Sequence, residues 1–210
     1  MATCQCAAAE AAAQAGEAEC EGRPLMTDAR RGGHEMTASS LRATLIGAWR
    51  TNNRITVHLI EGLPTALWDV AVPGSNRTIR AVAAHLHNAR CGWIKTLGRE
   101  HGIATPARVD HRRVTRRQLV AALNRSSKGM EAVLELGLAA GGQVPPSKGY
   151  VWRNLPLDVG HVLAYFVAHE GHHRGQIVML ARELGQRLPA EVVNGLWQWT
   201  TRVSEWRAKA

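Results

Sequence analysis

Three histidines and a glutamate lie within five consecutive residues of the chain, His169-Glu170-Gly171-His172-His173, in the stretch FVAHEGHHRGQIV. The stretch matches the H-E-x-x-H motif of zinc proteases, in which two histidines bind zinc and the glutamate is the general base. It also contains the E-x-x-H motif of di-iron helical bundles. A third possibility is a simple H-x-x-x-H pair of metal ligands. Each interpretation implies a different chemistry.

The first two interpretations fit the rest of the chain poorly. A zinc protease needs a third ligand downstream, but no histidine follows His173, and only Glu183 and Glu191 remain as candidates. No strand that would bind a peptide substrate is predicted nearby. A di-iron bundle needs a second E-x-x-H motif, and outside this stretch no glutamate has a histidine three residues later. We therefore favour the H-x-x-x-H pair.

The apolar residues around this pair recur with the period of a helix that begins near Asp158 and stops at Gly185. His169 and His173 fill a gap in the apolar stripe of this helix. The stripe consists of Val162, Phe166, Ile177, Leu180 and Leu184. Residues four apart differ by about 40° around a helix, so both rings lie on one face, which we expect to point into the protein. A single buried histidine is usually bonded to a carbonyl, but two stacked imidazoles need a shared partner, and a metal ion supplies one.

Zinc and related metals usually have at least three protein ligands, so a third ligand must come from another part of the chain. The segment AAHLHNA offers His85 and His87. His85 shares a face with the apolar residues of its helix, whereas His87 lies about 200° further round and is expected to face away. His172 is a rival partner for His169, but it lies off the apolar stripe and is placed at the rim. We predict a metal site made of His85, His169 and His173.

Helical periodicity extends over most of the chain, and no strand pattern competes with it. Ser39 or Ser40 is expected to cap the first helix, and Thr115 and Gln118 form a capping box for another. Pro189 is expected to open a last helix. The predicted helices cover about residues 39–61, 78–97, 115–136 and 158–184, with the terminal one carrying a stripe of Trp199, Val203 and Trp206. This pattern predicts an all-α fold, a four-helix bundle with an additional C-terminal helix.

The chain divides by composition into residues 1–38, predicted to be a disordered tail, and residues 39–210, predicted to be the helical domain. The tail lacks the basic region and apolar core of a signal peptide. Three of the four cysteines lie in its first 20 residues and only Cys91 lies in the domain, so no disulfide framework is expected. A cytoplasmic location is therefore predicted. No apolar run is long enough to cross a bilayer.

The chain has a formal charge of +9, and its excess of positive charge lies in residues 37–210. Such a surface suits nucleic acids, anionic lipids or small anions. No nucleic-acid-binding motif accompanies the charge, so neither nucleic acid nor a membrane is the expected partner. Five arginines follow the second predicted helix, and they are either solvated or bind the carboxylates of a thiol cofactor or an anionic substrate. They are Arg108, Arg112, Arg113, Arg116 and Arg117.

Three segments resemble, in order and spacing, the DinB family (DinB/YfiT-like proteins) over about residues 39–185. The segments are LPTALWDV, TIRAVAAHLHNA and LPLDVGHVLAYFVAHEGHHRGQIVMLARELG. The resemblance implies a four-helix bundle of up-down-down-up type that is often a dimer. It also implies one divalent metal ion (zinc, nickel, iron or manganese), held by His85, His169 and His173. The helical faces select the same trio. Glu170 varies in the family, so the resemblance gives it no role as a base.

The DinB family includes metal-dependent hydrolases and S-transferases that use low-molecular-weight thiols. The resemblance therefore implies a metal-dependent enzyme that activates a thiol or water toward a small electrophilic substrate. Three imidazoles leave coordination positions open, which is typical of catalytic sites, and a metal lowers the pKa of bound water or thiol. The alternative is a non-enzymatic metal-binding stress-response protein. The sequence predicts no catalytic residue beyond the metal ligands.

Overall fold

The structure is a computed structural model that describes residues 37–71, 74, 77–148, 150 and 154–208. The tail predicted over residues 1–38 lies outside these residues except for its last two positions. The elements are α1 (Ala38–Gly62), η1 (Thr65–Leu67), α2 (Ile79–Gly98), η2 (Arg99–His101), α3 (Arg116–Ala139), α4 (Val159–Glu183), α5 (Ala190–Gly195) and α6 (Trp199–Arg207). Over the described ranges there is no β-strand, only two isolated bridges. The predicted all-α fold is confirmed.

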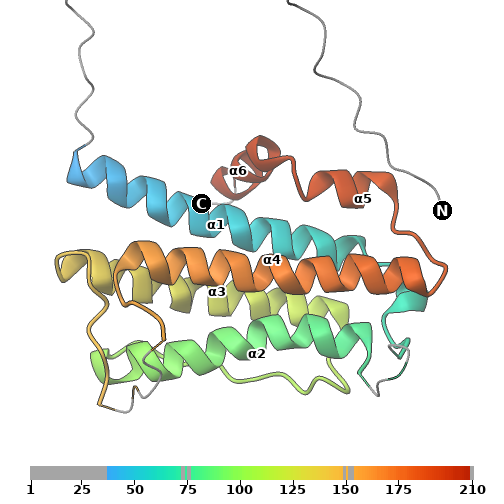
Figure 1. Cartoon of the computed structure of the whole chain (residues 1–210), viewed down its shortest axis with the longest axis horizontal. Coiled ribbons are helices and arrows are strands. Elements are labelled where there is room, and N and C mark those ends of the chain that lie inside the picture. Colours follow the sequence, from blue (N-terminus) through green and yellow to red (C-terminus); the bar gives the residue numbers. More distant parts are fainter. Residues whose placement is uncertain (1–36, 72–73, 75–76, 149, 151–153, 209–210) are drawn as a thin grey trace, which may run out of the picture. The chain divides into compact units, whose positions relative to one another are not determined.

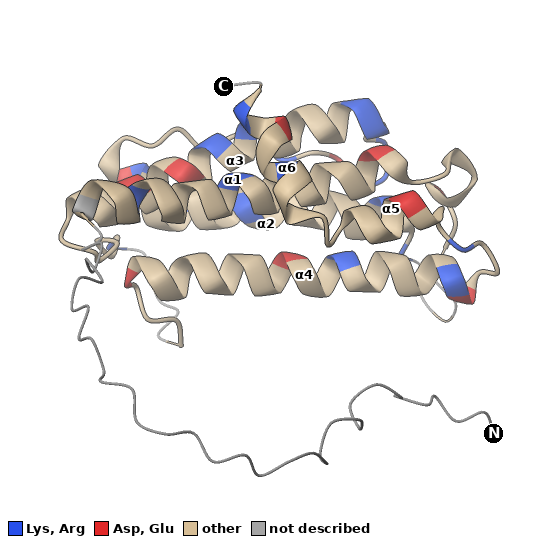
Figure 2. Cartoon of the chain, turned by 90° about the horizontal axis from the view of Figure 1, so that it is seen from above, with Lys and Arg blue, Asp and Glu red and all other residues tan. Residues whose placement is uncertain are grey.

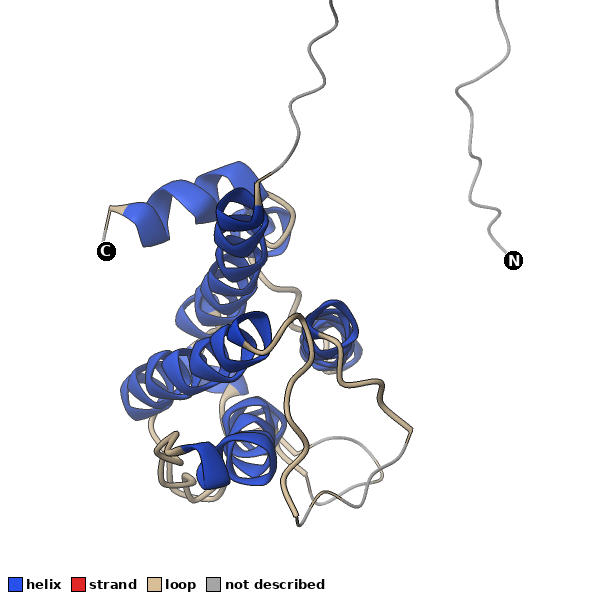
Figure 3. Ribbon diagram, turned by 90° about the vertical axis from the view of Figure 1, so that its left-hand side faces the viewer, coloured by secondary structure: helices blue, strands red, loops and turns tan. Residues whose placement is uncertain are grey.

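The four long helices form a bundle with up-down-down-up topology. In Figure 1, α1 and α4 run in one direction, and α2 and α3 run in the other. α1 packs against α3 and α4, and α2 packs against the same two helices. Figure 3 shows the long helices nearly end-on. Because α2 and α3 run the same way, the chain between them must return along α2, a distance of about 30 Å.

Polar side chains of α2 hold this returning loop, residues 102–115, against the helix. The Asn88 side chain donates to the Val109 carbonyl (3.0 Å) and accepts from the Val109 amide (2.9 Å). Arg80 donates to the backbone carbonyl of Arg112. The loop backbone, including the part that carries Arg108 and Arg112, is therefore held beside the N-terminal half of α2.

The helix ends largely follow the predicted signals. Thr115 and Gln118 form the capping box of α3. Gly185 follows α4 with a φ of 73°, a conformation that favours glycine. The cap of α1 differs from the prediction, because the side chain of Thr37 accepts from the Ser40 amide (3.2 Å). Helix α1 therefore begins at Ala38, slightly earlier than predicted.

The C-terminal segment forms two short helices where a single one was predicted. Helix α5 ends at Gly195, which lies against His58 of α1 so closely that an added Cβ would be 2.2 Å from the ring Nε2. The chain then turns before α6, whose Trp206 indole donates to the Thr51 hydroxyl (3.1 Å). Figure 1 shows both helices lying along α1. The tryptophan stripe is therefore used partly against the bundle, although Trp199 remains 41% exposed.

Two apolar clusters fill the bundle, one at each end. One contains Leu59 and Leu86, and the other contains Trp49 and Phe166. Polar residues occupy the layer between them, as described below. None of the described helices is both long enough and apolar enough to cross a membrane.

Candidate metal centre

Three histidines from two helices converge beside the bundle core. His85 lies on α2, and His169 and His173 lie one turn apart on α4. Each offers a ring nitrogen, and these nitrogens all lie within 4.8 Å of one another. The ring centroids of His85 and His173 are 4.6 Å apart, as are those of His169 and His173. The structure thus brings together all three residues that the sequence selects.

Gln176 fixes the orientation of one ring of the trio. Its side-chain oxygen lies 2.8 Å from Nδ1 of His173, and its amide nitrogen lies 2.9 Å from Nε2 of His172. Because an amide oxygen only accepts, Nδ1 of His173 carries the proton, and Nε2 presents its lone pair. That Nε2 lies 3.2 Å from Nε2 of His169. Gln176 was not among the residues predicted from the sequence, although it follows His172 by four residues and so lies on the same face.

All three imidazoles are held in the neutral form that binds metals. Burial lowers the pKa of His85 from 6.5 to about 4, with further contributions from His173 and His169. Burial is also the largest cause of the lowered pKa values of His169 and His173. Neutral imidazole is the ligand form of histidine, so no proton has to be displaced at neutral pH.

The trio fits a divalent metal ion. Zinc binds imidazole nitrogen at about 2.0–2.1 Å, and tetrahedral geometry then places two such ligands about 3.3 Å apart. The 3.2 Å between the Nε2 atoms of His169 and His173 is close to that separation. The described group contains three nitrogen donors and no carboxylate. This donor set suits zinc, nickel or iron better than manganese, which prefers oxygen ligands.

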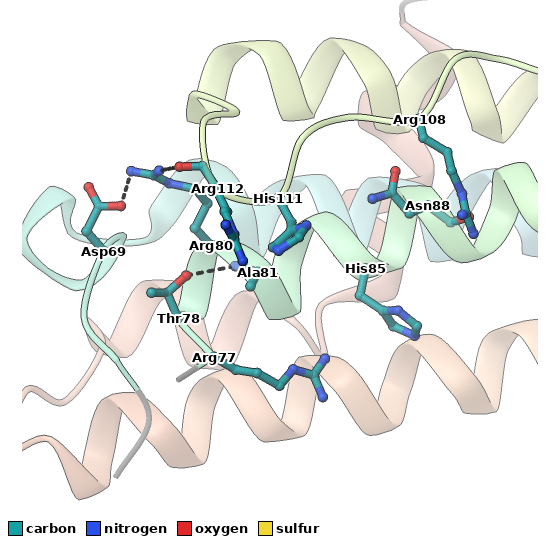
Figure 4. A pocket seen from close by; sticks show the side chains of 10 residues that line it. All are labelled: Asp69, Arg77, Thr78, Arg80, Ala81, His85, Asn88, Arg108, His111 and Arg112. Carbon is teal, nitrogen blue, oxygen red and sulfur yellow. Dashed lines mark hydrogen bonds and ion pairs between the residues drawn. The ribbon is translucent and has the colours of Figure 1, made fainter. Parts of the chain in front are cut away.

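His85 is part of the wall of a cavity of about 560 Å³. The start of α2, the turn before it and the returning loop surround this cavity (Figure 4). Two of the five arginines that follow the second predicted helix, Arg108 and Arg112, line this cavity. Arg116 lies elsewhere, over the Trp68 ring. The trio therefore borders a polar cavity through His85, the member of the trio that lines it.

The comparison with protein families agrees with this arrangement. The DinB family model matches residues 26–207, which include all four long helices and the trio. The chain belongs to the DinB family. Among curated proteins, no sequence matches the chain. The resemblance inferred from the sequence is therefore confirmed at the level of the family.

The other histidines of this DinB bundle lie outside the trio. His87 lies outside the trio, but the prediction that it faces away from the interior is wrong: it is fully buried, with Nε2 bonded to the Ala107 carbonyl (3.0 Å) and Nδ1 3.0 Å from the Ser126 hydroxyl. His172 is exposed and contacts Gln176. His161 is exposed at the start of α4 beside Asp158. The rim position predicted for His172 thus agrees with its contact to a neighbour of the trio.

Glu170 lies in a buried ionic network behind the trio. Its Oε1 accepts from Nε of Arg90 (2.6 Å), and its Oε2 accepts from Nη2 of Arg90 (2.8 Å). Asn52 and Thr56 of α1 each donate to Oε2 at 2.9 Å. Arg174 donates to Asn52 and Thr56, and its guanidinium is 3.7 Å from the carboxylate. Arginine charge keeps the pKa of this carboxyl below its usual value despite burial.

This network excludes the zinc-protease interpretation of the motif. A general base needs a lone pair directed at a water or substrate, whereas both oxygens of Glu170 are bonded within the core, and the residue is only 1% exposed. In Figure 2, an acidic and a basic residue lie near each other in the middle of α4, where the sequence has Glu170 and Arg174. Glu170 therefore stabilises the bundle behind the histidines.

The buried stripe of α4 runs slightly differently from the prediction. Its fully buried members include Val162, Phe166, Glu170 and Ile177, whereas Leu180 is only partly buried. The stripe centre therefore passes through Glu170, and His169 lies at its edge. This position lets His169 and His173 meet His85 of α2 at the edge of the core.

The lowered histidine pKa values predict a stability change with pH. Between pH 6.5 and about 4, the unfolded chain binds more protons than the folded chain, because the folded His85 stays neutral. We therefore expect the free energy of unfolding of the metal-free full chain to fall as the pH is lowered from 7 to 5. Urea unfolding at several pH values measures this change.

A variant with His85, His169 and His173 all replaced by glutamine is the control for this prediction. It should show a smaller fall in the free energy of unfolding over the same pH range. Some fall remains expected, because burial also lowers the pKa of His87. Equal pH dependence in the variant and the native chain would show that the trio does not cause it.

Proposed function

We propose that this protein is a metal-dependent enzyme whose divalent ion is held by His85, His169 and His173. The observation that carries the proposal is the convergence of three neutral imidazoles from two helices, one of which, His85, lines an open cavity. A purely structural metal site usually has four protein ligands and is closed. Three ligands beside a cavity leave room for a substrate.

A divalent ion bound in this way lowers the pKa of a coordinated water or thiol and so provides a nucleophile at neutral pH. The reaction class that fits is attack on a small electrophile, either thiol transfer or hydrolysis. The all-nitrogen donor set favours zinc, nickel or iron as the ion.

The remaining residues of the site have positioning roles in this proposal. Gln176 keeps the proton on Nδ1 of His173, so that Nε2 stays available as a ligand. Asn88 holds the returning loop over the cavity through its two bonds to Val109. Together these contacts keep a ligand atom and a cavity wall in place, which reduces the reorganisation needed during a reaction.

Turnover of a model electrophile tests the proposal. The full chain, loaded with zinc, nickel or iron in turn, is assayed with 1-chloro-2,4-dinitrobenzene and a low-molecular-weight thiol, and with p-nitrophenyl acetate for hydrolysis. We expect metal-dependent turnover in at least one assay, lost on chelation and in His173→Ala. His161→Ala is the matched control, because it removes an exposed histidine from the same helix.

Two outcomes would contradict the proposal that this protein is a metal-dependent enzyme. Turnover that survives chelation would mean that the trio is not the reactive centre. Metal bound by the trio without turnover in either assay would favour the alternative, a non-enzymatic metal-binding stress-response protein.

A further inference from the structure

The cavity beside the trio carries more positive than negative charge. Four arginines line it, and among its described lining residues Asp69 is the only acid. Arg80 forms an ion pair with Asp69 and also donates to the Arg112 carbonyl. With four arginines and one aspartate, the described lining residues of the cavity carry a net positive formal charge. A concave wall of one sign concentrates the electric field and attracts counter-ions.

Two of these arginines lie on either side of His85. Figure 4 shows the Arg77 side chain extending toward His85 and Arg108 beyond it, beside Asn88. After burial and the neighbouring histidines, the charges of Arg77 and Arg108 also lower the pKa of His85. Arg77 acts in the same direction on the pKa of His173. A small ligand held by these guanidinium groups would therefore lie next to the trio.

The side chains, and not the start of α2, supply the donors for an anion. The first amides of α2 are already used: Ile79 donates to the Val70 carbonyl (3.3 Å), and Ala81 donates to the Thr78 hydroxyl (3.1 Å). Guanidinium groups present several N–H donors in a plane and bind carboxylate or phosphate through two parallel bonds. The hydrogen bonds between Asn88 and the loop fix the backbone that carries Arg108. This lowers the entropic cost of ordering Arg108 when a ligand binds.

We propose that Arg77, Arg108 and Arg112 bind the carboxylate or phosphate group of a small soluble substrate whose reactive group lies at the histidine trio. This inference rests on the proposed function and narrows its substrates to small anions. A cavity of about 560 Å³ has the size of a small-molecule site. Nucleic acids and anionic membranes are too large to enter it and would bind only at its rim.

Anion binding is measured by calorimetry on the full chain, with succinate and inorganic phosphate as probes at constant ionic strength. Each titration is made before and after chelation, so that binding to a metal ion is separated from binding to the arginines. We expect Arg77→Ala, Arg108→Ala and Arg112→Ala each to raise the probe dissociation constant by about tenfold, the equivalent of about 1.4 kcal/mol. The preferred probe identifies the substrate group as carboxylate or phosphate.

Arg42→Ala is the matched control. It removes one positive charge from an exposed arginine at the N-terminal end of α1, which lies at the opposite end of the bundle from the start of α2 (Figure 1). Its probe affinity should equal that of the native chain. Circular dichroism checks that each variant is folded, and Arg108→Lys, which keeps the charge but not the planar donors, should bind with intermediate affinity.

The inference would be overturned if no probe bound to the native chain, if the cavity variants and the native chain had equal affinities, or if Arg42→Ala showed an equal loss. Tighter binding of single-stranded DNA or anionic vesicles through the same arginines would overturn it as well. Because calorimetry needs no turnover, a failure here leaves the proposed enzyme intact. If the protein bound the probes but showed no turnover, the proposed enzymatic function would be rejected and the proposed anion site would stand.

Discussion

Glu170→Ala is expected to destabilise the protein by about 3–5 kcal/mol, because it leaves a buried arginine charge without its partner. Arg90 is 1% exposed, and its guanidinium makes two bonds to the Glu170 carboxylate. Most domains are only about 5–15 kcal/mol more stable than their unfolded chains, so the loss would be severe. Urea unfolding of the metal-free full chain measures it.

Two further variants separate the effect of burying an ion pair from the effect of losing a carboxylate charge. Glu131→Ala removes a partly exposed carboxylate that pairs with Arg50, and such pairs contribute only about 0–1 kcal/mol. Combining Glu170→Ala with Arg90→Met removes both buried charges and should recover part of the stability lost in Glu170→Ala alone. If Glu170→Ala destabilised the protein no more than Glu131→Ala does, the buried network would not stabilise the bundle.

The second large effect concerns metal affinity. Loss of a residue that only orients a metal ligand weakens metal binding by about 10–100-fold. Each of His85→Ala, His169→Ala and His173→Ala is expected to weaken binding of zinc or nickel by more than this. The reason is that two imidazoles satisfy fewer coordination positions than three. Competition with a chelator of known affinity measures the dissociation constants in the full chain.

The control variants for this prediction are His161→Ala and His172→Ala. His161 is exposed at the start of α4 and should have no effect. His172 contacts Gln176, which in turn holds His173, so its loss should have a smaller effect than the loss of any trio member. Equal losses of metal affinity in His172→Ala and His169→Ala would mean that His169 and His173 are wrongly assigned as the metal-binding pair of α4.

The trio could be predicted because helical faces are a local property. Four-residue spacing places His169 and His173 together, and the apolar neighbours of His85 select it over His87. The fold followed from the same periodicity, since four amphipathic helices can bury their apolar faces only against one another. The C-terminal break at Gly195 could not be predicted, because it depends on a close approach to His58, which is far away in the sequence.

The buried network was missed for a related reason. Arg90 and Glu170 are 80 residues apart, and nothing in their local segments shows that they meet. A signal was nevertheless present. Arg90 follows Leu86 by four residues, and Glu170 follows Phe166 by four, so each charge shares a face with a fully buried apolar side chain. Opposite charges on two apolar stripes are expected to pair, because an unpaired buried charge is costly.

Elemental analysis of the full chain, purified without a histidine tag, tests the central claim most directly. The native chain and His161→Ala should each contain close to one equivalent of zinc, nickel or iron per chain. The variants His85→Ala and His173→Ala should contain little or none. Full metal content in both of these variants would contradict the assignment of the trio as the metal site.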